Sequence, residues 1–417
     1  MSGNVCTSVE DSLAVESAEW PRWKVLLLIT LAVVAVYSNS FDADFHFDDT
    51  HNIIQNYRIR DFSRLGWYVT HAKRPVSYFT FWVNYSLSGL DVTGFHILNV
   101  AIHILAAFFM YLFVHQTLTL PSVRERYGKY AFIIALSSSL LWALNPVQTQ
   151  AVTYIVQRMA SMAGMFYLIA FYTYARFRTA QRPGQSRLFL ILTVLFYLLS
   201  VGSKENTALF PLAVVAYELI FFHQTDIRFF RKYGKYVISA AVMLAAIVYF
   251  INNGLTFFGF KGEQNIFDIM RMYNDKPFTM AERIMTEWRV LVHYFLLFVM
   301  PLGYSDKSGL YIRLNIDYDY PISHGLFDPV STFFCLVVLA GLLVYAFQCR
   351  KTRPVFCFFI LWYFINNIIE STFLPLAPVF EHRVYLPSVA FAVLLVIGVL
   401  RVTGCLSLQN GVNDHEM

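Results

Sequence analysis

The stretch WKVLLLITLAVVAVYSNSFDADFHFDDT, residues 23–50, joins a membrane-length apolar run to an acidic segment. A helix needs about 20 mostly apolar residues to cross the hydrocarbon core, and the run that starts at Trp23 supplies them. The acidic pair Asp48-Asp49 follows shortly after it. Because carboxylates are expensive at membrane depth unless they are paired or solvated, we expect this pair to lie just outside the bilayer.

Composition extends this prediction to the whole chain. Of the 417 residues, 57% are hydrophobic and 14% are charged, with a mean hydropathy of +0.51, whereas soluble proteins carry about 25% charged residues. We therefore predict an all-α, polytopic membrane protein. The net charge of +5 is too small and too dispersed to indicate a nucleic-acid partner. The five cysteines show no paired spacing of a zinc site or a disulfide framework.

Apolar runs recur along the chain, and basic residues orient them. The runs lie near 23–40, 93–115, 130–145, 154–175, 188–202, 206–222, 236–252, 287–302, 328–348, 355–369 and 384–400. Lys and Arg cluster after the second, fourth and sixth runs and again at 350–353. The positive-inside rule places these clusters in the cytoplasm and the segment 41–92 outside.

The run at 287–302 breaks this alternation and carries Glu287, Arg289 and His293. We expect a re-entrant or interfacial helix there, which leaves ten crossings, with eleven still open. The predicted organisation is a cytoplasmic tail (1–22), one transmembrane domain (23–402) with outer loops 41–92 and 253–327, and a short cytoplasmic tail (403–417).

Asp48 and Asp49 are candidate catalytic residues, because a carboxylate at the membrane surface can take a proton from a hydroxyl nucleophile. Asp is also common in turns and at helix starts, and the pair taken alone is more typical of such a turn.

Cationic residues at the predicted outer face form a second candidate set. A guanidinium binds phosphate oxygens in a bidentate manner, so several cations converging there would suit a lipid-borne phosphate. Each one alone is more typical of a side chain that snorkels at a helix end. The set comprises Arg74, Arg158, Lys204, His382 and Arg383.

Polar residues within or beside the apolar runs are candidates for the lining of a cavity. Asn99 and His103 are four apart and share a helical face. Asn366, Asn367 and Glu370 end the run at 355–369. A histidine with satisfied hydrogen bonds in the core is the commoner meaning of such a residue, and none of these sets has metal-ligand spacing.

Several of these segments together resemble the transmembrane tetratricopeptide-repeat O-mannosyltransferases and their bacterial relatives. The resemblance covers most of the chain. It is carried by Phe47-Asp48-Asp49 with Asn52, Arg74-Pro75-Val76-Ser77, Gly94-Phe95-His96-Ile97-Leu98-Asn99, Asn145 to Val152 with Arg158, Ser203-Lys204-Glu205-Asn206, and Glu381 to Ser388.

The resemblance implies a GT-C fold and an inverting glycosyltransferase. Such an enzyme moves mannose or another hexose from a polyprenyl-phosphate donor to an acceptor hydroxyl, plausibly of protein Ser or Thr, on the periplasmic or luminal side. The membrane would be a bacterial inner membrane or the endoplasmic reticulum. Asp48 or Asp49 would be the base, and the five cations above would hold the donor phosphate. The substrate cavity would be lined by Glu205, Glu381, His103, Asn99 and Gln150. A divalent metal, Mg²⁺ or Mn²⁺, stays open.

Two departures from the family pattern affect this expectation. Asn145, Gln148 and Gln150 stand where the family usually has His and Glu, so that segment lacks titratable groups. No tetratricopeptide repeats follow the last run, so acceptor recognition is expected from the outer loops or from a partner. A transferase acting on glycolipids or polysaccharides, and a non-enzymatic flippase or transporter of lipid-linked sugars, remain alternatives.

Overall fold

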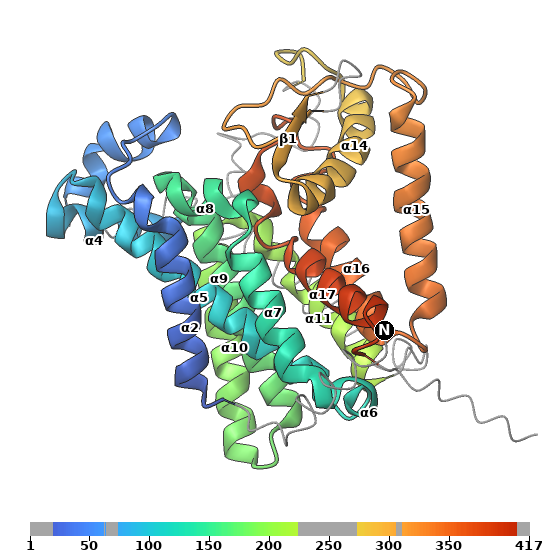
Figure 1. The fold of residues 1–417 in the computed structure, drawn as a ribbon. Helices are drawn as coiled ribbons and strands as arrows, with labels where there is room; N and C mark the ends of the chain where they lie inside the picture. Colours follow the sequence, from blue (N-terminus) through green and yellow to red (C-terminus); the bar gives the residue numbers. More distant parts are fainter. Residues whose placement is uncertain (1–19, 62, 64–73, 224–272, 306–310, 407–417) are drawn as a thin grey trace, which may run out of the picture.

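The chain folds into a bundle of helices. The computed structural model describes residues 20–61, 63, 74–223, 273–305 and 311–406 (Figure 1). The run predicted at 236–252, most of both tails and parts of both outer loops lie outside these residues. The helices are α2 (Arg22–Tyr37), α4 (Pro75–Ser88), α5 (Val92–Leu118), α6 (Arg124–Tyr127), α7 (Ala131–Ala143), α8 (Thr149–Thr153), α9 (Arg158–Thr179), α10 (Pro183–Ser203), α11 (Phe210–Tyr217), α14 (Met280–Val299), α15 (Ser331–Cys349), α16 (Pro354–Asn367) and α17 (Val389–Val402).

The predicted helical membrane fold is confirmed. Among the described residues, six helices are long and apolar enough to cross a membrane, or seven if the bent pair Arg124–Ala143 and Pro146–Thr153 forms one span. Two shorter apolar helices, α16 and α17, add to these. The chain is thus a multi-pass membrane protein. The six spans are Arg22–Ser40, Val92–Leu118, Ile155–Thr179, Pro183–Ser203, Glu205–Phe222 and Ser331–Cys349.

Two of the predicted basic loops lie together at one end of the bundle. Arg126 donates a hydrogen bond to the carbonyl of Thr352, which joins the loop before α7 to the turn between α15 and α16. Trp20, just before α2, packs against Phe132 at the start of α7. The loops at 124–130 and 350–353, which the positive-inside rule places together, therefore do lie together, and α2 and α7 both begin at this end (Figure 1).

Helix α9 forms the centre of the bundle and packs against both α5 and α10. Small residues on α9 allow close approach, as is usual where membrane helices meet. At Gly164 an added Cβ would come within 2.9 Å of the Tyr385 ring. Tyr385 is fixed from other sides by His103 Nδ1, 2.8 Å from its hydroxyl, and by Trp142, which donates to its carbonyl at 3.0 Å.

Helix α14 lies across the end of the bundle opposite the basic loops. Near its start, Arg283 donates to the carbonyl of Glu370, just beyond the end of α16. Near its end, the Phe298 carbonyl accepts from Asn145, just beyond the end of α7. Because α7 and α16 end on the same side, both ends of α14 are on that side (Figure 1). This arrangement agrees with the re-entrant or interfacial helix predicted from its charges.

Two local features frame α14. A capping box starts the helix, because the Thr279 side chain accepts from Glu282 N while Glu282 accepts from Thr279 N at 2.8 Å. The helix is followed by a two-stranded antiparallel hairpin, β1 (Leu302–Ser305) and β2 (Tyr311–Arg313). The all-α prediction did not include this hairpin.

This topology predicts a labelling pattern with impermeant maleimides, in a protein whose five native cysteines are replaced by serine. Leu87→Cys at the end of α4, and Met280→Cys and Met300→Cys at the two ends of α14, should react from outside. Lys351→Cys should react only after permeabilisation. These positions are all exposed. Opposite reactivity at the two ends of α14 would show that the helix crosses the membrane and would contradict this arrangement.

Candidate active site

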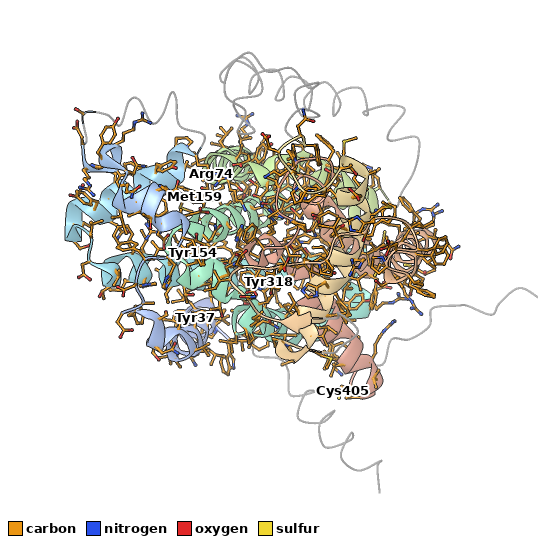
Figure 2. The ribbon with its side chains drawn as sticks, turned by 90° about the horizontal axis from the view of Figure 1, so that it is seen from above. Tyr37, Arg74, Tyr154, Met159, Tyr318 and Cys405 are labelled. Atoms are coloured by element: carbon orange, nitrogen blue, oxygen red, sulfur yellow. The ribbon has the colours of Figure 1, made fainter. Side chains whose placement is uncertain are left out.

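A pocket of about 360 Å³ opens at the end of the bundle opposite the basic loops, within the size range of small-molecule sites. Two of its lining residues, Arg74 and Tyr154, come from separate parts of the chain and are labelled in the view from above (Figure 2). Its lining brings together seven of the residues predicted from sequence: Asp48, Arg74, Lys204, Glu205, Glu370, His382 and Arg383. The chain thus gathers candidate carboxylates and candidate cations around one cavity.

The two residues of the acidic pair have different surroundings. Asp49 is fully buried, and its carboxylate accepts from the backbone N–H groups of Val156 at 2.7 Å and His46 at 3.0 Å. Burial raises the pKa of Asp49 to about 6, against the opposing effect of these two hydrogen bonds. Asp48 is exposed and lines the pocket. Asp49 therefore anchors the segment, and Asp48 faces the cavity.

The turn that presents Asp48 is held in a strained conformation. Phe47 has φ of +41°, which is uncommon for a residue with a bulky side chain and is concentrated at functional sites. The Asp48 N–H donates to the Tyr154 hydroxyl at 2.8 Å, and Phe47 and Tyr154 meet edge to face. Together with the hydrogen bonds of Asp49, these contacts fix the direction in which the Asp48 side chain points.

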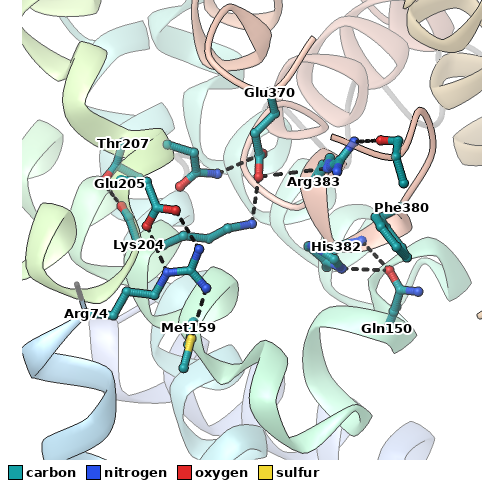
Figure 3. A network of polar contacts seen from close by, with 12 residues as sticks. Arg74, Gln150, Met159, Lys204, Glu205, Thr207, Glu370, Phe380, His382 and Arg383 are labelled. Carbon is teal, nitrogen blue, oxygen red and sulfur yellow. Dashed lines mark hydrogen bonds and ion pairs between the residues drawn. The ribbon is translucent and has the colours of Figure 1, made fainter. Parts of the chain in front are cut away.

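Arg74 and Glu205 form a bidentate ion pair on one side of the pocket. Arg74 Nη2 lies 2.5 Å from one carboxylate oxygen of Glu205, and Nε lies 2.8 Å from the other (Figure 3). The remaining Nη1 contacts the Met159 sulfur at 3.2 Å. Arg74 comes from the start of α4 and Glu205 from the turn after α10, so this pair joins the outer loop to the bundle. Most of the hydrogen-bonding capacity of Arg74 is already used.

Lys204, Glu370 and Arg383 form a second buried group, with 4%, 6% and 5% of their surfaces exposed. Lys204 Nζ lies 2.8 Å from Glu370 Oε1, and Arg383 Nε lies 4.0 Å from the same oxygen (Figure 3). Burial alone would raise the pKa of Glu370, but Lys204 and Arg383 hold it below its ordinary value. The Glu370 carboxyl is therefore charged and is shared between two cations.

His382 is neutral in this setting. Gln150 Oε1 accepts from the His382 backbone N–H at 2.8 Å and lies 2.9 Å from its Nδ1, so Nδ1 carries the proton and Nε2 is an acceptor. Burial, reinforced by the nearby Lys204 and Arg383, lowers the pKa of His382 well below its ordinary value. His382 can thus accept a hydrogen bond from a hydroxyl, but it is not the cation that the sequence analysis placed beside a phosphate.

Three predicted site residues lie away from the pocket lining. Arg158 is fully buried, donates to Asn99 at 2.5 Å and to the Phe95 carbonyl at 2.9 Å, and lies over the Phe81 ring. Asn99 also donates to the Val152 carbonyl at 3.0 Å. His103 is bonded to Tyr385 and to the Ala143 carbonyl. All three tie helices together, and none of them lines the cavity.

Glu381 also supports the pocket from behind. It is buried, and its carboxylate accepts from the Tyr318 hydroxyl at 2.5 Å and from Asn315 N at 2.7 Å. Burial raises its pKa to about 7. It fastens the segment after β2, which carries Asp317 to the pocket, onto the segment that carries His382 and Arg383. Gln150 similarly supports the pocket through His382.

The sequence analysis named some lining residues without a role and missed others. Glu370 was a general candidate for a cavity, whereas Gln157 and Asp317 were not singled out. Asp317 lies in an alternating acidic and aromatic stretch, 315–320, of the second outer loop. That alternation was the signal that could have found it. Asn366 and Asn367 instead return their hydrogen bonds to α16.

The residues of the pocket do not suit a resident metal ion. Across the described ranges, no three His, Cys, Asp or Glu side chains come close enough together to hold one. Each buried carboxylate of the pocket already faces a cation of the chain. We therefore derive no step through Mg²⁺ or Mn²⁺.

Curated proteins with related sequences share one description. Human protein O-mannosyl-transferase TMTC4 is 30% identical over 209 residues, which are 45% of this chain and 28% of the relative. Human protein O-mannosyl-transferase TMTC3 is 24% identical over 406 residues, 90% of this chain and 42% of the relative. The chain is similar to protein O-mannosyl-transferases. This similarity confirms the resemblance indicated by the motifs.

The same description extends to an insect relative. Protein O-mannosyl-transferase Tmtc1 of Drosophila melanogaster is 29% identical over 185 residues, 41% of this chain and 20% of the relative. The chain thus spans less than half the length of these relatives. No protein-family model matches the chain, and no solved structure matches it.

The different surroundings of Asp48 and Asp49 predict different stabilities for their amide variants. Asp49→Asn places an NH₂ group against one of two backbone N–H donors, so it should lower the free energy of unfolding by about 1–3 kcal/mol. Asp48→Asn should change it by less than about 0.5 kcal/mol, as exposed substitutions usually do. Thermal unfolding of the purified proteins in detergent measures both. Equal stability of the two variants would contradict the anchoring role of Asp49.

Proposed function

We propose that this protein is an inverting membrane glycosyltransferase of GT-C type that glycosylates protein Ser or Thr hydroxyls. The donor would be mannose or another hexose linked to a polyprenyl phosphate. The observation that carries the proposal is the pocket itself, where exposed Asp48 shares one cavity with Lys204 and Arg383. An exposed carboxylate and a set of buried cations are the two parts that this reaction needs. The names of the relatives support the reaction class.

Asp48 is the proposed general base. It takes the proton of the acceptor hydroxyl as that oxygen attacks the anomeric carbon of the sugar. The bond from the anomeric carbon to the phosphate oxygen breaks on the opposite face, so the configuration inverts. The electron pair leaves with the polyprenyl phosphate. Asp49 cannot share this role, because both of its oxygens accept backbone N–H groups.

Arg383 is the proposed main contact of the leaving phosphate. Its nearest carboxylate is 4.0 Å away, whereas Arg74 is bound to Glu205 by two short contacts. The Arg383 guanidinium is positioned over the Phe380 ring by hydrogen bonds to the carbonyls of Ala377 and Pro378. A fixed cation of this kind stabilises the charge that develops on a leaving phosphate.

The remaining lining residues suit the other parts of a lipid-linked sugar. Ile369, Leu374, Leu376 and Phe380 give the pocket an apolar wall for the first units of a prenyl chain. Neutral His382 offers an acceptor for a sugar hydroxyl. The pocket lies at the end of the bundle opposite the basic loops, and under the positive-inside rule this supports a reaction on the outer, periplasmic or luminal, side.

The base assignment predicts that Asp48→Asn transfers sugar about a hundredfold or more slowly than wild type, the usual range for a lost general base. Its thermal stability should be unchanged. Mass spectrometry of glycoproteins and glycolipids from cells with either form measures the loss and also identifies the acceptor class. A flippase has no use for a base, so normal glycosylation in cells with Asp48→Asn would overturn the assignment of Asp48 as the base and would be the outcome expected of a flippase. A loss confined to glycolipids would instead identify a lipid acceptor.

The phosphate assignment predicts an effect on donor use alone. Arg383→Lys keeps the charge but loses the planar fork, so the KM for donor should rise about tenfold, and Arg383→Ala should raise it further. The KM for acceptor at saturating donor should stay within about twofold. Steady-state kinetics with a short-chain prenyl-phosphate sugar tests this. If Arg383→Lys behaves as wild type, Arg383 does not contact the phosphate.

A further inference from the structure

The Glu370 carboxylate sits where three groups of the pocket converge. Lys204 Nζ lies 2.8 Å from Oε1, Asn206 Nδ2 donates to Oε2 at 3.1 Å, and Arg383 Nε lies 4.0 Å from Oε1 (Figure 3). These groups come from the turn after α10 and from the 3-10 turn Glu381–Val384 (η11). Two cations and an amide donor around one point make an anion-binding site, and its occupant is a side chain of the protein.

The other ion pair of the pocket has a different character. Glu205 meets Arg74 through two short contacts in matched planar geometry, which is the strong form of an ion pair. Glu370 reaches Lys204 through one contact and Arg383 only at 4.0 Å. The position of Glu370 is thus the easier one for an external anion to take, while Arg74 and Glu205 stay together.

The Glu370 backbone is fixed independently of its carboxylate. Its carbonyl accepts from Arg283 Nη2 at 2.8 Å, and Arg283 also donates to the Leu376 carbonyl at 2.5 Å. Arg283 in turn is paired with Glu287, 3.0 Å away on the next turn of α14. The carboxylate can therefore leave the cations by rotation of its side chain, without movement of the loop, and enter the open part of the pocket that it lines.

We propose that the Glu370 carboxylate occupies the binding site of the donor's phosphate in the donor-free protein and is displaced when the lipid phosphate binds. The inference rests on the proposed function, and it identifies the Glu370 carboxylate as the group that competes with the donor's phosphate. In the donor-free state the internal carboxylate keeps Lys204 and Arg383 paired, because an unpaired buried cation is costly. Donor binding exchanges one anion for another. Only protein in which the Glu370 carboxylate has left this position can bind the donor. The apparent affinity for the donor is therefore lower, in proportion to that fraction of the protein.

The exchange predicts that removing the charge of Glu370 strengthens binding of a phosphate-bearing lipid. Farnesyl phosphate and farnesol share one prenyl tail and differ in the phosphate. With the full-length protein in detergent, Glu370→Gln should bind farnesyl phosphate on the order of tenfold more tightly than wild type, because one like charge at close range is removed. Binding of farnesol should not change. The Gln side chain keeps an acceptor for Lys204, and Asn206 Oδ1, which has no hydrogen-bond partner among the described residues, can receive its NH₂ group.

Glu218→Gln is the matched control. Glu218 is similarly buried and paired with Arg178 at 2.7 Å, but it lies at the opposite end of the bundle. It should leave both affinities unchanged. If Glu370→Gln does not fold, Glu370→Asp decides: its shorter side chain withdraws the carboxylate from Lys204, so it should bind farnesyl phosphate more tightly than wild type by a smaller factor.

Each outcome separates the inference from the proposed function. Wild type that prefers farnesyl phosphate to farnesol, with variants of Glu370 that bind it equally or more weakly, would overturn the displaced-carboxylate inference and leave the glycosyltransferase proposal standing. A preference for the phosphate that appears only in Glu370→Gln would support the inference strongly. If neither wild type nor Glu370→Gln distinguishes the two lipids, the pocket has no phosphate-binding site, and both proposals fail.

Discussion

A charge that leaves water must be paired or hydrogen-bonded, and this constraint shapes the outer end of the protein. Taking an ion into a poorly solvated interior costs several kcal/mol even after relaxation, so an unpaired buried charge is rarely tolerated. Lys204 with Glu370 and Arg74 with Glu205 satisfy it by joining separate segments of the chain, and Arg283 with Glu287 satisfies it within α14. The result is a polar layer over an otherwise apolar bundle, and the pocket lies within that layer.

The polar layer is held in register by the core beneath it. Tyr385 follows His382 by three residues and Arg383 by two, and it is packed against Gly164 of α9. The Tyr385 carbonyl accepts from Trp142, whose Nε1 also lies 3.1 Å from Ser388 Oγ. Trp362 donates to the Leu386 carbonyl from the other side. These contacts anchor the segment that carries the pocket cations to three separate helices, so its geometry is set by packing.

Residues of similar chemistry therefore have one of two roles: some line the pocket, and others support the segments around it. Arg158 and Arg383 are both buried arginines, yet Arg158 is enclosed by Asn99, Phe81 and Phe95 while Arg383 borders the cavity. Gln150 belongs to the segment where the family usually has titratable residues. Here its amide orients His382, which shows how that segment can serve the site by hydrogen bonding alone.

The sequence by itself determined that the chain is a multi-pass helical membrane protein, because long apolar runs act locally, and its flanking charges predict the orientation of the helices and an outer position for the acidic pair. It also indicated the interfacial α14, since three charged or titratable residues in one run conflict with a crossing. It could not divide the roles within Asp48-Asp49, because the two residues are chemically identical. That division depends on the backbone N–H of Val156, more than a hundred residues away, which binds one carboxylate and leaves the other in the pocket. Only the tertiary structure brings such distant partners together, and it likewise decided that the Glu370 carboxylate meets both Lys204 and Arg383.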